Sequence, residues 1–287
     1  GEFQQNQGEG LGTSGVGNVK RNVGSLSGLL RYFPSPKLRF EAGMEQDFVE
    51  DFTAPLLFSF SGKWAVFNWY SVSFNASKNF RYPSFNDLYW KPGGNPDLKA
   101  ENSVQADLTQ EFKFGNFQFS LTPYYMKIHD MIRWISTPFG YYSPFNTNIV
   151  ESFGIEYQLK YYKSFNENSR LRLAANYIFS RSVNLDTGDQ LMYVPLHKAA
   201  ANVDFEYRFL KIYAQGMFTG LTYTTSNETR KDAIDPYFVM NAGIAATLKK
   251  KYTLGMRINN VTNSVYETVA YYPLPKRNYM FYATLNF

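Results

Sequence analysis

The chain has 287 residues, 18% of them aromatic, and a formal net charge of +5 at neutral pH. Its Lys and Arg residues are scattered, which excludes the basic stripe of a nucleic-acid-binding protein. Cysteine is absent, so the sequence has no disulfide framework, thiol nucleophile or thiolate metal site. Mean hydropathy is −0.37, and no run approaches the roughly 18 apolar residues of a spanning helix. Many aromatic residues without a long apolar run are typical of a membrane β-barrel, in which only alternate residues face lipid.

Residues 1–20 are rich in Gly, Gln and Asn, which predicts a loop. They lack the basic region and the apolar core of a signal peptide, so either a leader has been removed or the chain is part of a longer product. Beyond residue 20, apolar and polar residues alternate, as on strands with one apolar face. In Ala201–Phe209 the odd positions are apolar or aromatic, and the even positions are Asn, Asp, Glu and Arg. The alternation predicts thirteen strands, at residues 22–33, 38–50, 55–63, 69–80, 102–114, 117–133, 151–163, 170–182, 198–209, 211–224, 237–248, 252–261 and 277–287.

The predicted connections alternate between short turns and long loops. The long loops are residues 81–101, 134–150, 183–197, 225–236 and 262–276, and the exception is the short connection 51–54, where a long loop is due. Short turns at one rim and long loops at the other are typical of an outer-membrane barrel with its long loops outside the cell. A soluble β-sandwich requires neither this asymmetry nor such long strands.

The strand count also predicts direction and closure. Phe287 is expected at the periplasmic rim, so the last strand runs inward from the cell surface. Successive strands alternate in direction, so the first of thirteen also runs inward, and residues 1–20 before it are expected outside the cell. Thirteen antiparallel strands cannot close on themselves, because the first and last strands would meet in parallel. We therefore expect residues 1–20 to be an extracellular loop segment and residues 21–287 to be the C-terminal part of a larger transmembrane antiparallel β-barrel. The lumen of this all-β fold is expected to be wide and polar, and its predicted charged residues are Asp107, Glu111, Glu156, Lys160, Asp204, Glu206, Arg208 and Arg257.

The longest predicted loop, in residues 79–101, has an unusual composition. Its prolines, paired glycines and Asn/Asp residues predict an ordered loop. It also carries Tyr82, Phe85, Tyr89 and Trp90, which is more apolar surface than a free loop usually has. Such a loop either packs onto its neighbours or binds a ligand.

Three segments resemble TonB-dependent outer-membrane receptors. FRYPSFNDLY at residues 80–89, followed by GNPDLKAE at 94–101, resembles the paired loop boxes that this family carries between two barrel strands. NNVTNSVY at 259–266 resembles the family's segment before the last loop. YPLPKRNY at 272–279 leads into a terminal strand that ends in Phe287, as in the family.

The resemblance covers residues 20–287 and implies a barrel of about 22 strands with a plugged lumen. Thirteen predicted strands leave about nine strands, the N-terminal plug and the TonB-binding segment outside this sequence. The implied function is TonB-energised uptake of a scarce, bulky nutrient of the ferric siderophore or cobalamin class across the bacterial outer membrane. Two alternatives stay open: a surface binding or structural component that pairs with another chain, and a passive porin or barrel enzyme.

The resemblance also implies the partners. They are the receptor's own N-terminal plug and barrel half, the TonB complex acting through that part, and outer-membrane lipid, with a surface lipoprotein as a further candidate. No nucleic acid is expected.

The sequence predicts no enzyme and no cofactor, because it has no nucleophile motif, no phosphate loop and no metal-spaced cluster. His129 and His197 are interpreted as interfacial residues. Haem-uptake members carry a His between the two boxes, and residues 81–98 have none, which disfavours haem. Aromatic and cationic residues of the external loops are expected to contact ligand, with anchoring in the interfacial girdle as the alternative. They are Arg81, Tyr89, Trp90, Arg133, Trp134, Tyr141, Tyr142, Tyr223, Tyr271 and Tyr272, with Lys91, Phe139 and Phe145 beside them.

Overall fold

The computed structural model describes residues 2–9, 15–50, 52–249 and 251–285. They form one sheet of fourteen antiparallel strands, in which each strand pairs with the strands before and after it in the sequence. The strands are β1 (Glu2–Glu9), β2 (Asn18–Ser35), β3 (Leu38–Val49), β4 (Leu57–Phe67), β5 (Tyr70–Arg81), β6 (Glu101–Phe114), β7 (Phe117–Ser136), β8 (Tyr142–Asn166), β9 (Ser169–Asn184), β10 (His197–Tyr207), β11 (Leu210–Thr219), β12 (Tyr237–Leu248), β13 (Tyr252–Asn259) and β14 (Asn278–Leu285).

The only helical segments of the described residues are α1 (Phe85–Tyr89) and a 3₁₀ turn at Arg230–Asp232. No helix in this part of the chain is long and apolar enough to cross a membrane.

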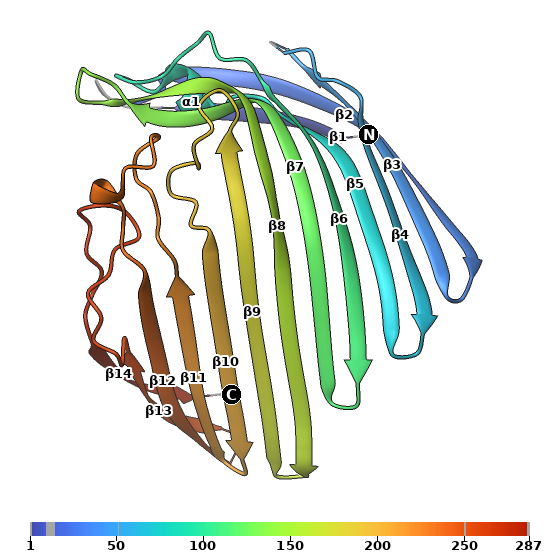
Figure 1. Ribbon diagram of the computed structural model, residues 1–287, viewed down its shortest axis with the longest axis vertical. Helices are drawn as coiled ribbons and strands as arrows, with labels where there is room; N and C mark the ends of the chain where they lie inside the picture. The colour runs from blue at the N-terminus through green and yellow to red at the C-terminus, as the bar shows by residue number, and fades with distance from the viewer. Residues whose placement is uncertain (1, 10–14, 51, 250, 286–287) are drawn as a thin grey trace.

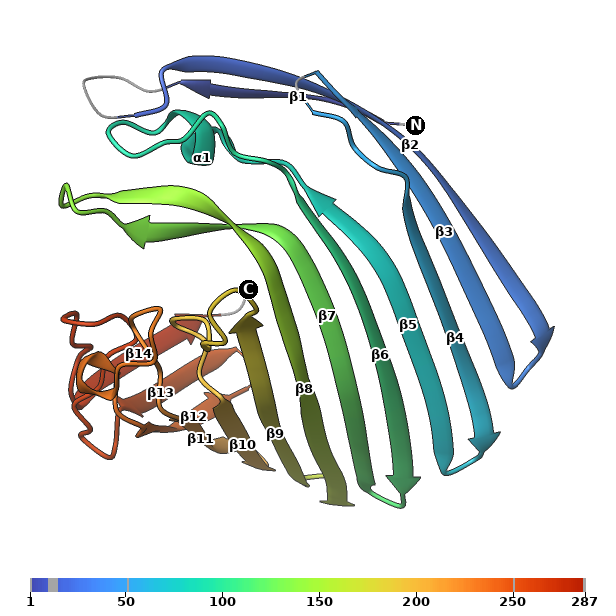
Figure 2. The same ribbon diagram turned by 45° about the horizontal axis from the view of Figure 1, so that its top comes forward.

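The sheet is strongly curved and open. Figure 1 shows β1 and β2 on the far side of the concave space behind β7–β9. Within the described residues the edge strands β1 and β14 do not pair with each other. Short turns lie at one end of the strands and longer connections at the other (Figures 1 and 2).

The two faces of the sheet differ in chemistry because side chains alternate along each strand. One face carries exposed large apolar residues such as Phe60, Leu108 and Leu159. The other face carries polar contacts, among them Asn75 Nδ2 donating to Asp107 at 2.9 Å. The long strands and this alternation are typical of a membrane barrel wall with an apolar outer face and a polar inner face.

All thirteen predicted strands are present, as β2 to β14. Residues Glu2–Glu9, which the composition placed in a loop, instead form β1 and pair with residues 18–25 of β2. The described sheet therefore has an even number of strands, fourteen, and the expectation that an odd number prevents closure is wrong. The sheet is open because β1 and β14 do not pair within the described residues. Phe287, expected at the periplasmic rim, lies outside the described residues.

Two further expectations, one about a connection and one about a lumen-facing residue, are wrong. Residues 134–150 are not a long loop, because β7 and β8 continue pairing to Ser136 and Tyr142, which leaves only residues 137–141 as a turn. Arg208 is not on the lumen face, because it lies in the turn after β10 with a positive φ of 53°.

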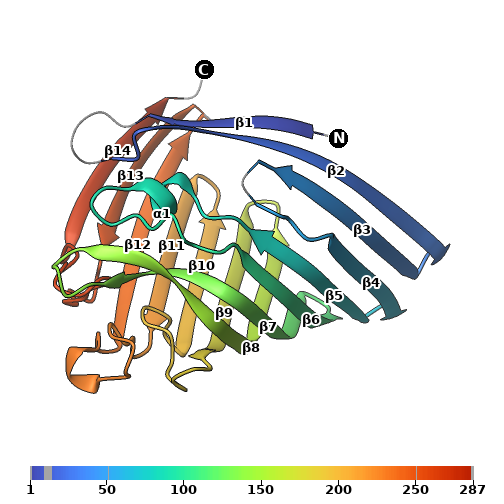
Figure 3. The ribbon, with the colours of Figure 1, turned by 90° about the horizontal axis from the view of Figure 1, so that it is seen from above.

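At the loop end, several hairpins extend across the concave side of the sheet. Figure 3 shows the β1–β2 hairpin, α1 and the upper parts of β7 and β8 reaching from the β2–β6 side toward β12–β14. This arrangement gathers segments far apart in the sequence over one end of the curved sheet.

Candidate ligand-binding surface

The predicted loop between β5 and β6 is folded around a short helix. Ser84 caps α1: its hydroxyl accepts from the Asp87 backbone, and the Asp87 carboxylate accepts from the Ser84 backbone. This reciprocal arrangement is a capping box, which satisfies helix-end donors that otherwise have no partner. Leu88 and Leu98 are buried against Ile132 of β7, so the loop has a small apolar core of its own.

Asp87 is the centre of the polar network below that core, and only 6% of its surface is exposed. Its carboxylate accepts from the Ser84 hydroxyl at 2.8 Å and from the indole Nε1 of Trp134 at 2.8 Å. Arg81 Nη1 lies 3.6 Å from the same carboxylate. A buried carboxylate is stable only when such donors surround it, so Asp87 fixes α1 to the upper part of β7.

Two of the three predicted cationic contacts, Arg81 and Arg133, are engaged within the protein, and Lys91 is exposed. Arg81 donates twice to Glu101, each time at 2.7 Å, in a bidentate pair across β5 and β6. Arg133 Nε donates to Thr147 at 2.9 Å, and burial lowers the pKa of Arg133. The geometry therefore gives these two side chains a structural role in holding the loop and the hairpin.

The rest of the loop runs along the upper part of β8. Asn146 accepts from the Lys99 backbone N–H at 2.9 Å and donates to the Lys99 carbonyl at 3.0 Å. Ser143 donates to the Gly93 carbonyl at 2.7 Å. A Cβ added at Gly93 would overlap the carbonyl of Tyr142. The close approach of the two backbones therefore requires glycine at this position. We call residues 82–100 with the upper β7–β8 hairpin, residues 130–147, the loop platform.

Arg21 of β2 fixes a third segment to the loop platform. Its guanidinium lies 4.8–5.1 Å from the ring centroids of Phe52, Tyr82 and Phe85, and it donates to the Pro83 carbonyl at 2.8 Å. Arg21 is 3% exposed, so its cation–π interaction is desolvated, and an interaction of this kind stabilises by about 2 kcal/mol. Arg21 thus ties the β1–β2 hairpin and the β3–β4 connection to the loop platform.

The predicted aromatic contacts divide into packed and exposed side chains. Trp134 is held by Asp87, and Tyr223 is half-buried. Phe139 is 81% exposed, and Tyr141 stacks on it with ring centroids 6.2 Å apart. The remaining predicted aromatics that are exposed are Tyr89, Trp90, Tyr142, Phe145, Tyr271 and Tyr272. The structure therefore presents aromatic surface on the platform and again on the β13–β14 loop, residues 260–277.

Three residues central to this arrangement were not among the predicted contacts: Arg21, Asp87 and Glu101. The Ser84-x-x-Asp87 spacing is a readable capping-box signal, and it identifies Asp87 as a helix-start residue. The roles of Arg21 and Glu101 depend on partners 62 and 20 positions away, so the sequence carries no local signal for them.

The lumen-side charges form ion pairs and hydrogen bonds along the wall. Glu111 lies 2.7 Å from Lys113 and 3.5 Å from Lys63. Arg172 pairs with Glu206 at 3.2 Å. No group of three or more His, Cys, Asp or Glu in the described residues is placed to hold a metal ion. These pairs fit a polar wall rather than a catalytic dyad.

Comparison with known proteins agrees with this geometry. A family model described as TonB dependent receptor-like, beta-barrel matches residues 2–261. The chain is 26% identical over 220 residues to the vitamin B12 transporter BtuB of Photobacterium profundum, a match that covers 75% of this chain and 35% of the relative. It is 28% identical over 228 residues to BtuB of Vibrio vulnificus strain YJ016, with the same two coverages.

The fold is also similar to a solved structure. A variant of the ferric enterobactin receptor PfeA from Pseudomonas aeruginosa superposes with a TM-score of 0.75 at 18% identity, covering 93% of this chain and 45% of that one. The chain thus spans about a third of the length of the curated relatives that it matches and just under half of this structural neighbour.

Proposed function

Because the chain belongs to the TonB-dependent receptor-like β-barrel family, whose members are outer-membrane transporters and receptors rather than enzymes, we propose that it forms much of the wall and outer mouth of a receptor for TonB-energised nutrient uptake. The observation that carries the proposal is the aromatic surface held over the open end of a wide, polar-lined sheet by the Asp87 network. Aromatic side chains give a large contact area with little loss of side-chain entropy, which suits a bulky ligand.

Of the two nutrient classes, the charge of the mouth favours cobalamin over an anionic ferric siderophore. Five connections at the loop end, residues 82–100, 137–141, 185–196, 220–236 and 260–277, carry eight acidic and six basic residues. Two of these cations are paired: Lys99 with Asp130 at 3.9 Å and Arg230 with Asp235 at 3.1 Å. A mouth without excess positive charge does not steer a multiply anionic chelate toward it, and the curated relatives quoted above are vitamin B12 transporters.

The proposal is tested by binding and by energised uptake. We expect the assembled receptor in detergent to quench its tryptophan fluorescence on titration with cyanocobalamin, and to respond at least tenfold more weakly to ferric enterobactin. Cellular uptake of labelled cyanocobalamin should stop when a proton uncoupler is added. Preferential binding of the ferric chelate would overturn the substrate class, and ion conductance in planar bilayers without energisation would favour a porin.

The proposed partners are the N-terminal plug, the other barrel strands and the TonB complex that acts through them. Intact-mass measurement of every polypeptide in the denatured, detergent-purified particle tests the first two. A polypeptide that carries the plug and further strands, joined to this chain or co-purifying with it, is expected. A 33.1 kDa chain that purifies alone as a stable particle would contradict the proposal and support an independent barrel component.

The proposed orientation places the longer connections and residues 1–20 outside the cell, and the short turns and the C-terminal end at the periplasmic rim. The absence of native cysteine allows single-cysteine labelling. A membrane-impermeant maleimide should label Phe139→Cys on intact cells and should label Asn116→Cys, in the short β6–β7 turn, only after the outer membrane is opened. The reverse pattern would overturn the orientation.

A further inference from the structure

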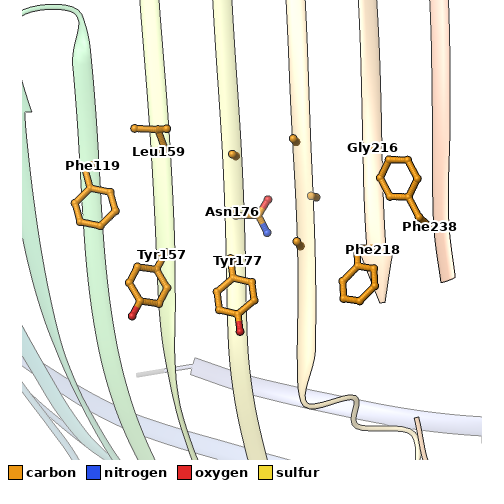
Figure 4. A pocket seen from close by; sticks show the side chains of 12 residues that line it. Phe119, Tyr157, Leu159, Asn176, Tyr177, Gly216, Phe218 and Phe238 are labelled. Atoms are coloured by element: carbon orange, nitrogen blue, oxygen red, sulfur yellow. The ribbon is translucent and has the colours of Figure 1, made fainter. Parts of the chain in front are cut away.

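An apolar groove of about 360 Å³ follows β10 on the outer face of the sheet. Figure 4 shows aromatic rings on the strands at both sides of it: Phe119, Tyr157 and Tyr177 on one side and Phe218 and Phe238 on the other. The groove does not belong to the mouth or to the lumen, because its lining residues other than Asn176 and Ala200 are on the apolar face of the wall.

The strand register explains the shape of the groove. Tyr177 of β9, Ala199 of β10 and Phe218 of β11 are direct cross-strand partners, so a single alanine separates two rings at this level. Two residues farther along, Ala175, Ala201 and Gly216 face one another. Ala175 and Ala201 leave room that larger side chains would fill, whereas the Phe238 ring lies over Gly216, where an added Cβ would meet it at 3.0 Å. The two alanines therefore form the open floor of the groove below the two rings.

Polar and cationic groups lie above the groove on the same face. The Tyr177 hydroxyl and His197 Nδ1 are 2.8 Å apart, and the His197 ring stacks on Tyr177. Arg181 is exposed and lies four residues after Tyr177 on β9. Because side chains alternate along a strand, the even spacing puts both on the same face. Arg181 forms no ion pair with any residue in the described part of the chain, whereas the neighbouring cation Lys127 lies 3.6 Å from Glu151.

We propose that this groove holds one acyl chain of an anionic lipid of the outer leaflet, with the lipid's headgroup at Arg181 and His197. The proposal uses the outer-membrane location of the family and is independent of the nutrient. Charge complementarity selects the occupant: an unpaired cation stands directly above an apolar groove, as an anionic amphiphile requires.

The dimensions agree with a lipid that stands in one leaflet. Arg181 and Ala175 are six residues apart on β9, which corresponds to about 20 Å along the strand. Half of the membrane's hydrocarbon thickness is about 15 Å. A headgroup at Arg181 therefore places the chain beside the wide floor of the groove.

Native mass spectrometry of the assembled receptor tests the site. The protein is titrated with dimyristoyl phosphatidylglycerol, with the phosphatidylcholine of identical chains, and with inorganic phosphate. We expect one phosphatidylglycerol to bind at least tenfold more tightly than the others. Ala199→Trp, which fills the space between the two rings, should abolish this binding. Arg181→Gln should weaken phosphatidylglycerol about fivefold, as expected for one cation near an anionic surface, and should leave phosphatidylcholine unchanged.

Matched variants show whether a loss of lipid binding comes from the filled groove or from misfolding. Ala106→Trp adds the same ring on the apolar face of β6, outside the groove, and Lys78→Gln removes a cation on the apolar face of β5; both should bind lipid as the unmodified protein does. Ala201→Leu provides a second way to fill the groove, and heat-modifiable mobility on gels reports folding of each variant. Equal lipid retention by Ala199→Trp and the unmodified protein would overturn the proposal. Saturation by inorganic phosphate alone, or a dimer mass in place of bound lipid, would also overturn it.

Discussion

The loop platform and the β13–β14 loop present aromatic side chains in opposite ways. The platform has a buried core of Leu88, Leu98 and Ile132 and a buried carboxylate that joins α1 to β7. The β13–β14 loop is held by Asn260 and by polar contacts to β12, such as the Ser264 hydroxyl donating to the Phe238 carbonyl at 2.7 Å, while Tyr271 and Tyr272 are 86% and 71% exposed. Segments with few buried apolar contacts open at lower free energy. The comparison suggests a preorganised surface that faces an adaptable one.

Removal of the Asp87 carboxylate is expected to have the largest effect on the difference in order between the loop platform and the β13–β14 loop. Asp87→Ala leaves the Trp134 indole and the Ser84 backbone N–H without their acceptor and leaves Arg81 with Glu101 alone. Unpaired buried donors of this kind destabilise by about 1–3 kcal/mol each. We expect amide exchange in residues 84–95 to rise to the level of the β13–β14 loop.

Asp97→Ala is the matched control, because the Asp97 side chain is exposed and its carboxylate contacts no donor in the described residues. It should leave exchange unchanged. Retained protection in Asp87→Ala would show that the apolar core alone orders the platform.

A smaller effect is expected when the two backbones of the platform are forced apart. Gly93→Ala places a methyl group against the Tyr142 carbonyl, and overpacking of this kind costs about 1–3 kcal/mol. Thermal unfolding followed by tryptophan fluorescence, with Trp90 and Trp134 as local probes, should show a lower first transition. Gly28→Ala, where an added Cβ meets nothing within 4 Å, should leave that transition in place. Equal curves for both variants would contradict the close approach.

The third change loosens the platform from its neighbour and leaves its interior intact. Arg21→Met keeps an apolar stem but removes both the charge that lies over Phe52, Tyr82 and Phe85 and the hydrogen bond to the Pro83 carbonyl. We expect a loss of about 1–2 kcal/mol, seen as faster amide exchange in β1 and residues 18–25 with α1 still protected. Arg31→Met on the same strand removes only an exposed pair with Glu41 at 3.8 Å, and should change exchange little. Equal amide exchange in Arg21→Met and Arg31→Met would show that the Arg21 contacts do not hold the β1–β2 hairpin to the loop platform.

The smallest structural effect is expected in the β13–β14 loop. Tyr272→Ala removes an exposed ring and should leave stability and amide exchange unchanged. If that ring contacts the nutrient, cyanocobalamin affinity should fall about tenfold, as for a contact residue of moderate weight. Val265→Ala, at another exposed apolar position of the loop, is the control. Unchanged affinity in Tyr272→Ala would restrict ligand contact to the platform side.

The alternation of residue types was sufficient to predict the strands of the wall. In β10, for example, Ala201, Val203 and Phe205 alternate with polar residues because lipid and water require different side chains on the two faces. The same rule missed the upper ends of β7 and β8, where Trp134 pairs with Pro144. Pairing at the upper ends of β7 and β8 is set by the partner strand, and it does not require an apolar face.

The candidate surface was predictable only in its composition. Exposed rings such as Phe139 and Tyr272 follow from aromatic residues in long connections. The engagement of Arg81 does not, because its acceptor Glu101 is 20 residues away and comes close only when β5 and β6 pair. The sequence alone does not show which acidic residue pairs with a cation at a strand end, because that residue lies on a neighbouring strand.

The strand order has a consequence for assembly. Every strand pairing in the described residues joins successive strands, so the sheet can grow one hairpin at a time. Each added strand closes only the connection to the strand before it. The entropic cost of closing such a connection rises slowly with its length. Topologies built from contacts near in sequence form faster than those that must first bring distant segments together. The loop platform depends on β5 to β8 and could therefore be ordered as soon as that run of hairpins has formed, before the rest of the wall is in place.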